Sequence, residues 1–310
     1  MNARSFALFF AASLAACGGA DEEAEGNPEA GGAQIEVADV GFMTPESVLH
    51  DAAGDVYLVS NINGAAGEKD DNGFISQLSP DGAVTNLKWI TGDSANVTLH
   101  APKGMAIRGD TLYVADIDCV KMFVRSTSAP AGEVCIEDAT FLNSVGVDAS
   151  GTLYVTDTGV NGDFSDNDQD AVWRFTPDGQ TNKLAEGPQL GGPNGIAFNE
   201  EGAFVVTFSS GEIYQVGPGG ERRNVLPGVA ERQLDGIVFT NDGGYLFSSW
   251  GDRAVHRVDA MGATTTLIAD VESPAGIGYD AQRNRVLVPL FTPNRVIIKE
   301  VPPTPEAPVF

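Results

Sequence analysis

Six segments of this 310-residue chain share one pattern, and this repeat constrains the fold more than any other feature. In each segment an apolar run is followed by a turn with glycine or asparagine and then by a second run with an aromatic or branched centre. The second runs centre on Tyr57, Tyr113, Tyr154, Val205, Leu246 and Leu287, at intervals of 41 to 56 residues. Such a period is typical of four-stranded propeller blades. We therefore predict an all-β fold, a six-bladed β-propeller over residues 34–303. A β-sandwich or two separate domains is the alternative, but neither architecture would require the repeated strand pattern to keep one register over so long a stretch of sequence.

The last blade lacks a fourth strand of its own, because the chain runs from Arg295–Val301 into Pro302 and Pro303. The segment Ile35–Val40 resembles Leu267–Val271, which ends the fifth blade. An unpaired blade edge would invite aggregation. We predict that the amino-terminal strand completes the last blade and closes the ring.

The amino terminus is typical of an exported lipoprotein. Arg4 precedes an apolar run that ends in Leu14-Ala15-Ala16-Cys17, and the run is too short to span a bilayer. This tetrapeptide resembles the lipobox of bacterial lipoproteins, so we predict a signal peptide over residues 1–17, lipidation of Cys17, a flexible tether over 18–33 and a carboxy-terminal tail over 304–310. We expect an outer-membrane lipoprotein that faces the periplasm. An ordinary cleaved signal with an incidental cysteine is the alternative.

Two cysteines remain after the lipobox, Cys119 and Cys135, which lie 16 residues apart. Cysteines of exported proteins tend to pair, so a disulfide is one interpretation and two buried free thiols the other. The formal net charge of -25 repels phosphate backbones and anionic lipid headgroups. We expect no nucleic-acid partner, membrane contact only through the lipid anchor, a monomer, and a small-molecule substrate.

One position at the entrance of each innermost strand recurs 10 to 12 residues before the second-strand centre. These positions hold Glu46, Lys103, Asn143, Asn194, Asp235 and Ala275. By pseudo-symmetry their side chains point into the central channel at one level. Most are followed by Gly or Ser, where we expect a sharp backbone turn.

The ring offers hard oxygen ligands with two negative charges, which favours a divalent cation, calcium first, then magnesium, over zinc. Converging carboxylates repel one another, and a cation relieves that repulsion. We therefore predict a metal site formed by Glu46, Asn143, Asn194 and Asp235. A wet channel lined by polar groups is the alternative interpretation.

The segments Pro45-Glu46-Ser47, Leu142-Asn143-Ser144, Pro193–Phe198 and Leu234–Ile237 resemble the metal-binding motifs of the gluconolactonase, senescence-marker-protein and luciferin-regenerating-enzyme-like family. The resemblance covers the chain from about Gln34 to Val301. It implies a propeller of about six blades that holds calcium or another divalent ion and, in many members, hydrolyses lactones or phosphotriesters. It further implies that Glu46, Asn194 and Asp235 are metal ligands. Asn143 would be a ligand or a substrate contact, and Asp235 a general base or nucleophile.

Two residues depart from the family's pattern. Lys103 stands at the ring position of the second blade, where its ammonium could offset ligand charge, bind a substrate oxygen in catalysis or replace the metal. Ser144 follows Asn143, where lactonase-like relatives often have Asp. The sequence contains no motif of another catalytic or binding class: there is no phosphate-binding loop, no pair of histidines at zinc-binding spacing and no nucleophile elbow. Asp163, Asp166, Asp168 and Asp170 suggest a calcium loop, but a solvated acidic loop is the stronger interpretation.

Two functions remain open. The first is a metal-dependent hydrolase of a lactone or other small ester-like molecule. The second is a non-catalytic envelope binding module that resembles NHL-type propellers and holds a structural ion. Two insertions, 61–73 and 158–170, are candidate lids over the ring. We expect one wall of the mouth to be polar, with Asn61, Asp116 and Asp157, and the other to be aromatic and to contact substrate, with Phe208, Trp250 and Phe291. Packing of these aromatic side chains between blades is the alternative. Whether the pocket above the ion is open or filled by its own loops should separate the two functions.

Overall fold

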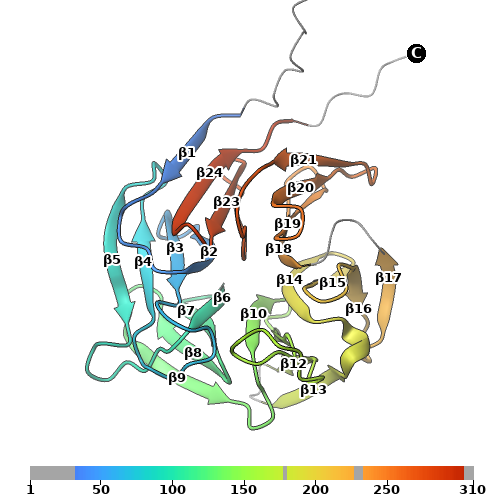
Figure 1. Ribbon diagram of the computed structural model, residues 1–310, viewed down its shortest axis with the longest axis horizontal. Coiled ribbons are helices and arrows are strands. Elements are labelled where there is room, and N and C mark those ends of the chain that lie inside the picture. Colours follow the sequence, from blue (N-terminus) through green and yellow to red (C-terminus); the bar gives the residue numbers. More distant parts are fainter. Residues whose placement is uncertain (1–31, 177–179, 227–232, 304–310) are drawn as a thin grey trace, which may run out of the picture. The chain divides into compact units, whose positions relative to one another are not determined.

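Six four-stranded antiparallel sheets surround a central axis in the computed structural model, which describes residues 32–176, 180–226 and 233–303 (Figure 1). The fold is the predicted six-bladed β-propeller. Each of the first five blades runs outward from the axis in chain order. Blades one to three comprise β2 (Pro45–Asp51), β3 (Val56–Asn61), β4 (Phe74–Leu78) and β5 (Val84–Thr91); β6 (Pro102–Arg108), β7 (Thr111–Asp116), β8 (Cys119–Val124) and β9 (Pro130–Cys135); and β10 (Leu142–Val147), β11 (Leu153–Asp157), β12 (Ala171–Phe175) and β13 (Thr181–Glu186).

The second half of the ring repeats this arrangement. Its blades comprise β14 (Pro193–Asn199), β15 (Gly202–Thr207), β16 (Ile213–Val216) and β17 (Arg222–Leu226); β18 (Leu234–Phe239), β19 (Tyr245–Ser249), β20 (Ala254–Val258) and β21 (Thr264–Ile268); and β22 (Gly278–Asp280), β23 (Arg285–Leu290), β24 (Arg295–Glu300) and β1 (Gln34–Val37). One 3-10 turn, Pro188–Leu190, precedes β14. The described residues contain no helix with the length and apolar character needed to cross a membrane.

The amino-terminal strand closes the ring, as predicted. β1 pairs with β24 in antiparallel register, with Ile35 opposite Ile298, so the first and last strands of the fold lie side by side (Figure 1). Val37 and Ile298 then share one buried cluster with Tyr57 and Val59 of the first blade. Closure therefore gives the last blade its outer strand and joins it to the first blade through an apolar core.

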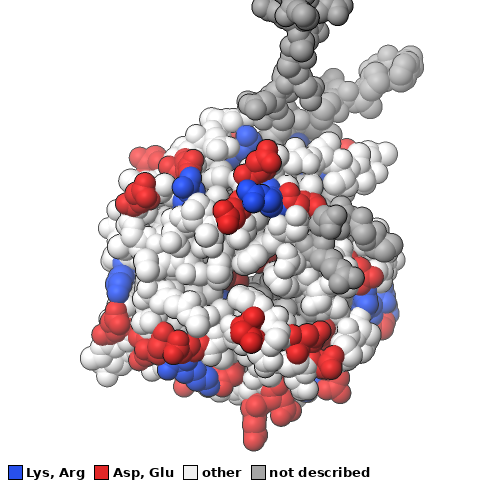
Figure 2. Space-filling view, viewed as in Figure 1, with Lys and Arg blue, Asp and Glu red and all other residues white. Residues whose placement is uncertain are grey.

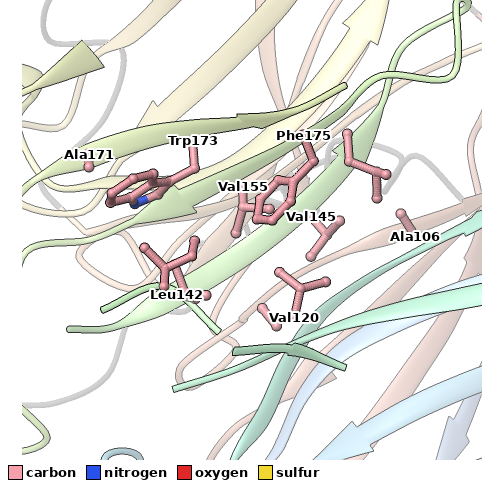
Figure 3. Close-up of a cluster of buried hydrophobic side chains, with 11 residues drawn as sticks. Ala106, Val120, Leu142, Val145, Val155, Ala171, Trp173 and Phe175 are labelled. Carbon is pink, nitrogen blue, oxygen red and sulfur yellow. The ribbon is translucent and has the colours of Figure 1, made fainter. Parts of the chain in front are cut away.

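The core lies between neighbouring blades. In one cluster Trp173 and Phe175 of β12 lie over Val155 of β11, and this face of the third blade meets Val120 and Ala106 of the second blade (Figure 3). Second strands are buried on both faces because sheets contact them from both sides. Outermost strands such as β9 are mostly exposed. The apolar runs that reveal the repeat are thus the middle of each blade.

In five of the six blades, a β-bulge places the ring residue at the start of the inner strand. In the first five blades the strand register shifts directly after the first residue, for example between Pro45 and Ser47 in β2. A bulged residue leaves the ladder and turns toward the channel. The glycines that follow do not make a left-handed turn there. A Cβ on Gly195 would lie 2.4 Å from the carbonyl oxygen of Asp235, so the close approach of the next blade requires glycine.

Candidate functional site

Five ring residues line one cavity at the axis, as the repeat predicted. Glu46, Lys103, Asn143, Asn194 and Asp235 come from the inner strands β2, β6, β10, β14 and β18. All five side chains are at least nine-tenths buried. The sixth ring position, Ala275, is fully buried and does not line the cavity. The ring therefore brings two acids, two amides and one lysine together.

Hydroxyl groups on alternate second strands support the ring. In the first, third and fifth blades a serine or threonine accepts the peptide N–H directly after the ring residue, which the bulge has freed from the ladder. In the third and fifth blades the same hydroxyl also donates to the ring residue's carbonyl in the next blade. The hydroxyl residues are Ser60, Thr156 and Ser248. These hydroxyl residues were not among the predicted site residues, although each stands one residue before the end of its strand.

The two acids each present an oxygen without a hydrogen-bond partner. Glu46 Oε2 and Asp235 Oδ1 are buried, and no described residue donates to either. A buried acceptor left unpaired costs about 1 to 3 kcal/mol, and more when it is charged. Burial raises the pKa of Asp235 to about 8. Burial and then the charge of Asp235 raise the pKa of Glu46 well above its usual value, and Lys103 opposes this shift.

Asn143 is oriented by its neighbours. Its amide nitrogen donates a 3.0 Å hydrogen bond to the hydroxyl of Thr158, which in turn donates to the carbonyl of Pro193. Since the nitrogen is engaged, the amide oxygen of Asn143 is the atom left for a ligand. Two unpaired carboxylate oxygens with asparagine oxygens form the kind of donor set that calcium or magnesium prefers. The residues present therefore fit a divalent cation.

Lys103 is held away from the acids. Its Nζ donates 3.0 Å hydrogen bonds to the carbonyl oxygens of Ala66 and Ala101 and lies 4.3 Å from the ring centre of Phe141. Burial lowers the pKa of this ammonium to about 8, an effect opposed by the charge of Glu46 and two other acids. Within the described residues no carboxylate lies within 4.0 Å of Nζ. Lys103 thus does not take the place of an ion between Glu46 and Asp235.

The two insertions meet above the ring. A Cβ built on Gly67 would lie 2.5 Å from the Cα of Gly162, so the insertions 61–73 and 158–170 contact each other through these two glycines. Side chains from both insertions line the cavity together with the ring. Its remaining volume is about 20 Å³, which is room for about one water molecule. The complete lining is Glu46, Ile62, Ala66, Lys103, Phe141, Asn143, Thr158, Val160, Phe164, Asn194, Phe208, Asp235, Trp250 and Phe291.

The aromatic wall forms where predicted, but the polar wall was wrong by one residue. Phe208, Trp250 and Phe291 line the cavity. Asn61, Asp116 and Asp157 do not, because they are the last residues of their strands and fully buried acceptors for main-chain N–H groups of nearby loops. The next residue in each strand exit turns inward, since successive side chains point in opposite directions. In those blades the wall-forming position therefore holds Ile62, Ile117 and Thr158, of which Ile62 and Thr158 line the cavity.

Other predicted groups lie apart from this cavity. Cys119 and Cys135 form a disulfide between β8 and β9. Together with Glu133, these two cysteines form the one cluster of three or more potential metal-binding side chains (His, Cys, Asp or Glu) in the described part of the chain. The two sulfurs of this cluster are bonded to each other. Asp163 and Asp166 are exposed and accept main-chain N–H groups of their own loop. Cys17 lies outside the described residues.

Fold and site together define a closed six-bladed propeller with an acidic, oxygen-rich centre in its channel. The chain belongs to the SMP-30/gluconolactonase/LRE-like family, whose model matches residues 75–276. No curated protein sequence matches the chain significantly.

Solved structures support the fold. A gluconolactonase from Xanthomonas campestris is 16% identical with a TM-score of 0.62, and the match covers 84% of this chain and 87% of that one. Virginiamycin B lyase from Staphylococcus aureus is 12% identical with a TM-score of 0.62, over 87% of this chain and 98% of that one. A chain of a nidogen/laminin complex is 19% identical with a TM-score of 0.57, over 72% and 80%.

Proposed function

We propose that this protein is a metal-dependent hydrolase of lactones or related small esters. The observation that carries the proposal is the pair of buried oxygens without partners, Glu46 Oε2 and Asp235 Oδ1, in a cavity that also presents Asn143 and Asn194. A protein that needed this ring only for stability would gain from pairing or removing these groups. Membership of a family with gluconolactonases supports the same reaction class.

The ring residues would have different roles in this reaction. Glu46, Asn143, Asn194 and Asp235 would hold a divalent ion, calcium first, and this ion would polarise the substrate carbonyl as a Lewis acid. Asp235 presents a free carboxylate oxygen to the cavity, so it can accept the proton of an attacking water. Lys103 has three N–H donors and uses two of them on main-chain carbonyls, which leaves one for a substrate oxygen.

Substrate entry from the lid side would require the lids to move. The cavity on that side, of about 20 Å³, admits a water molecule but no lactone, whereas Glu46, Asn143, Asn194 and Asp235 also line a channel of about 390 Å³ between the inner strands. For entry past the lids, the contact between Gly67 and Gly162 would have to open during each cycle. Lid opening of this kind takes microseconds to milliseconds and often limits turnover.

The closed cavity also supports a second function, a non-catalytic binding module with a structural ion. In that case the insertions would fill the pocket permanently, and the outer face would bind a partner. Export and lipid anchoring through Cys17 are part of both proposals, which place the protein as a monomer on the periplasmic side of the outer membrane.

One substitution separates the two functions. Asp235→Asn keeps an oxygen ligand but removes the proton acceptor and one charge. For a hydrolase, elemental analysis should still find the ion, while turnover of a panel of lactones, aryl esters and phosphotriesters falls by about 100-fold or more. A binding module would show the ion in wild-type protein but no turnover of any compound. Wild-type protein without a stoichiometric divalent ion would contradict the metal site in both.

A further inference from the structure

The cavity above the ring is lined by an unbroken series of aromatic side chains. Ring centres of consecutive members lie 5.7 Å apart for Phe141 and Phe164, 6.4 Å for Phe164 and Phe208, 5.7 Å for Phe208 and Trp250, and 5.1 Å for Trp250 and Phe291. We call these five residues the aromatic arc. Ile62, Ala66 and Val160 complete the apolar surface. Polar groups are therefore concentrated at the ring, at the bottom of the cavity.

Few polar groups on the upper wall are free to bind a ligand. The hydroxyl of Thr158 already accepts from Asn143 and donates to Pro193. Lys103 uses two donors on main-chain carbonyls. The indole N–H of Trp250 is buried without a hydrogen-bond partner among the described residues, so it is one donor open to a ligand. One indole N–H and the one remaining N–H of Lys103 are too few partners for several hydroxyl groups at once.

This distribution selects among lactones by their substituents. A polyhydroxylated sugar lactone would bury several hydroxyl groups against aromatic rings, and each unpaired hydroxyl weakens binding by about tenfold or more. An apolar lactone needs polar partners only for its ester group, which the ring supplies. Its hydrocarbon part would gain from contact with the aromatic arc.

We propose that the cavity binds lactones with an apolar body, an alkyl chain or a fused aromatic ring, in preference to polyhydroxylated sugar lactones. This inference rests on the proposed hydrolase function. Phe164 is the specificity-determining residue of the lid, because it belongs to the insertion 158–170 and contacts both Phe141 and Phe208. Its side chain must move aside to admit the ligand and can then cover the apolar body. On the face shown in Figure 2 the surface around the centre is mostly uncharged, and both acidic and basic groups lie mainly toward the periphery.

The test compares δ-decalactone and dihydrocoumarin with glucono-δ-lactone on the full-length protein loaded with calcium. We expect kcat/KM for the two apolar lactones to exceed that for glucono-δ-lactone by about 100-fold. Phe164→Ala should lower kcat/KM for δ-decalactone by about tenfold through KM and leave the value for glucono-δ-lactone within a factor of two. Leu226→Ala is the matched control, because Leu226 and Phe164 are both 43% exposed but Leu226 lies on the outer strand β17. It should change neither value.

Binding is measured separately from turnover, as the rise in melting temperature with each lactone. If glucono-δ-lactone is the better substrate, the inference is overturned while the hydrolase function stands. If no lactone is hydrolysed but the two apolar lactones alone raise the melting temperature, the hydrolase function fails and the ligand class stands. If no lactone is either hydrolysed or bound, both are overturned. A Phe164→Ala variant that behaves as wild type would remove Phe164 from the specificity argument.

Discussion

The Nζ atom of Lys103 donates a 3.0 Å hydrogen bond to the carbonyl oxygen of Ala66. Lys103 belongs to the inner strand β6, whereas Ala66 belongs to the first lid, and its neighbour Gly67 contacts Gly162 of the second lid. One buried ammonium thus connects the ring to both insertions. A single hydrogen-bond donor at the level of the candidate metal site therefore supports the closed mouth of the cavity.

Lys103→Met should loosen the lids without unfolding the propeller. Methionine keeps the length and apolar stem of the side chain but removes both hydrogen bonds and the contact of the charge with Phe141. We expect a loss of about 1 to 3 kcal/mol in the free energy of unfolding and faster amide exchange in 61–73 and 158–170. Lys121→Met is the control, since Lys121 is also buried but pairs with Glu133 on β9. Lids that exchange at the wild-type rate would contradict this role.

Removal of either ring carboxylate should lower the metal content. Asp235→Ala and Glu46→Ala each remove a ligand oxygen together with its charge, so elemental analysis should find less than half of the wild-type calcium. A chelator should lower the melting temperature of wild type and have little effect on either variant, because an ion that binds only the folded state stabilises it. Asp163→Asn in the exposed loop should behave as wild type in both assays. Equal calcium in all four proteins would place the ion elsewhere.

Tyr57→Phe tests the contact between the first and last blades and its pH dependence. The hydroxyl of Tyr57 donates a 2.7 Å hydrogen bond to Asp280, and although burial alone would raise the pKa of Asp280, this bond and those from Arg283 hold it below its usual value. A carboxyl group whose pKa is lower in the folded than in the unfolded protein stabilises the fold at pH values above its unfolded pKa of about 4. This stabilisation is lost as the pH falls through the pKa of the group in the folded protein. The variant should therefore lose about 1 to 2 kcal/mol at pH 7 and less below pH 3 in urea unfolding.

The control for this prediction is Tyr214→Phe. Tyr214 is as buried as Tyr57, but its hydroxyl has no hydrogen-bond partner among the described residues. Loss of that hydroxyl should be neutral or slightly stabilising at every pH. A Tyr57→Phe deficit that stays constant from pH 7 to pH 3 would show that Asp280 is not the group involved.

Deletion of the closing strand should expose an edge. A chain that begins at residue 32 retains the hydrogen bond from Glu300 to the carbonyl of Ala33 and all of β1, so its melting temperature should equal that of the mature protein. A chain that begins at Gly41 lacks β1 and leaves the outer edge of β24 unpaired, which should cost at least 3 kcal/mol and cause association on a sizing column. An unchanged melting temperature would contradict closure by β1.

Cys17→Ser should release the protein from membranes. The apolar run and the small residues before Cys17 predict that its thiol is lipidated after export. Fractionation of a Gram-negative host should find wild type with the outer membrane and the variant in the soluble periplasmic fraction. Wild-type protein that is already soluble would show that the lipobox interpretation is wrong.

The sequence by itself determined the number of blades, the closing strand and the ring. These follow from periodicity, because a repeat that folds six times the same way places equal positions at equal depth. Glu46, Asn143, Asn194 and Asp235 could therefore be brought together by counting residues, and the family motifs pointed to the same four positions.

Only the tertiary structure decided what each ring residue faces. The direction of Lys103 depends on Ala66 in another blade, and the support of Asn143 depends on Thr158. The predicted polar wall of the cavity mouth was wrong by one position in each strand. Side chains along a strand point alternately to opposite sides, so an error of one residue exchanges the positions that face the cavity with those that are buried away from it. Contact between Gly67 and Gly162 lies in insertions that do not repeat. Symmetry carries no information about such segments, and their packing is decided by contacts between residues far apart in the chain.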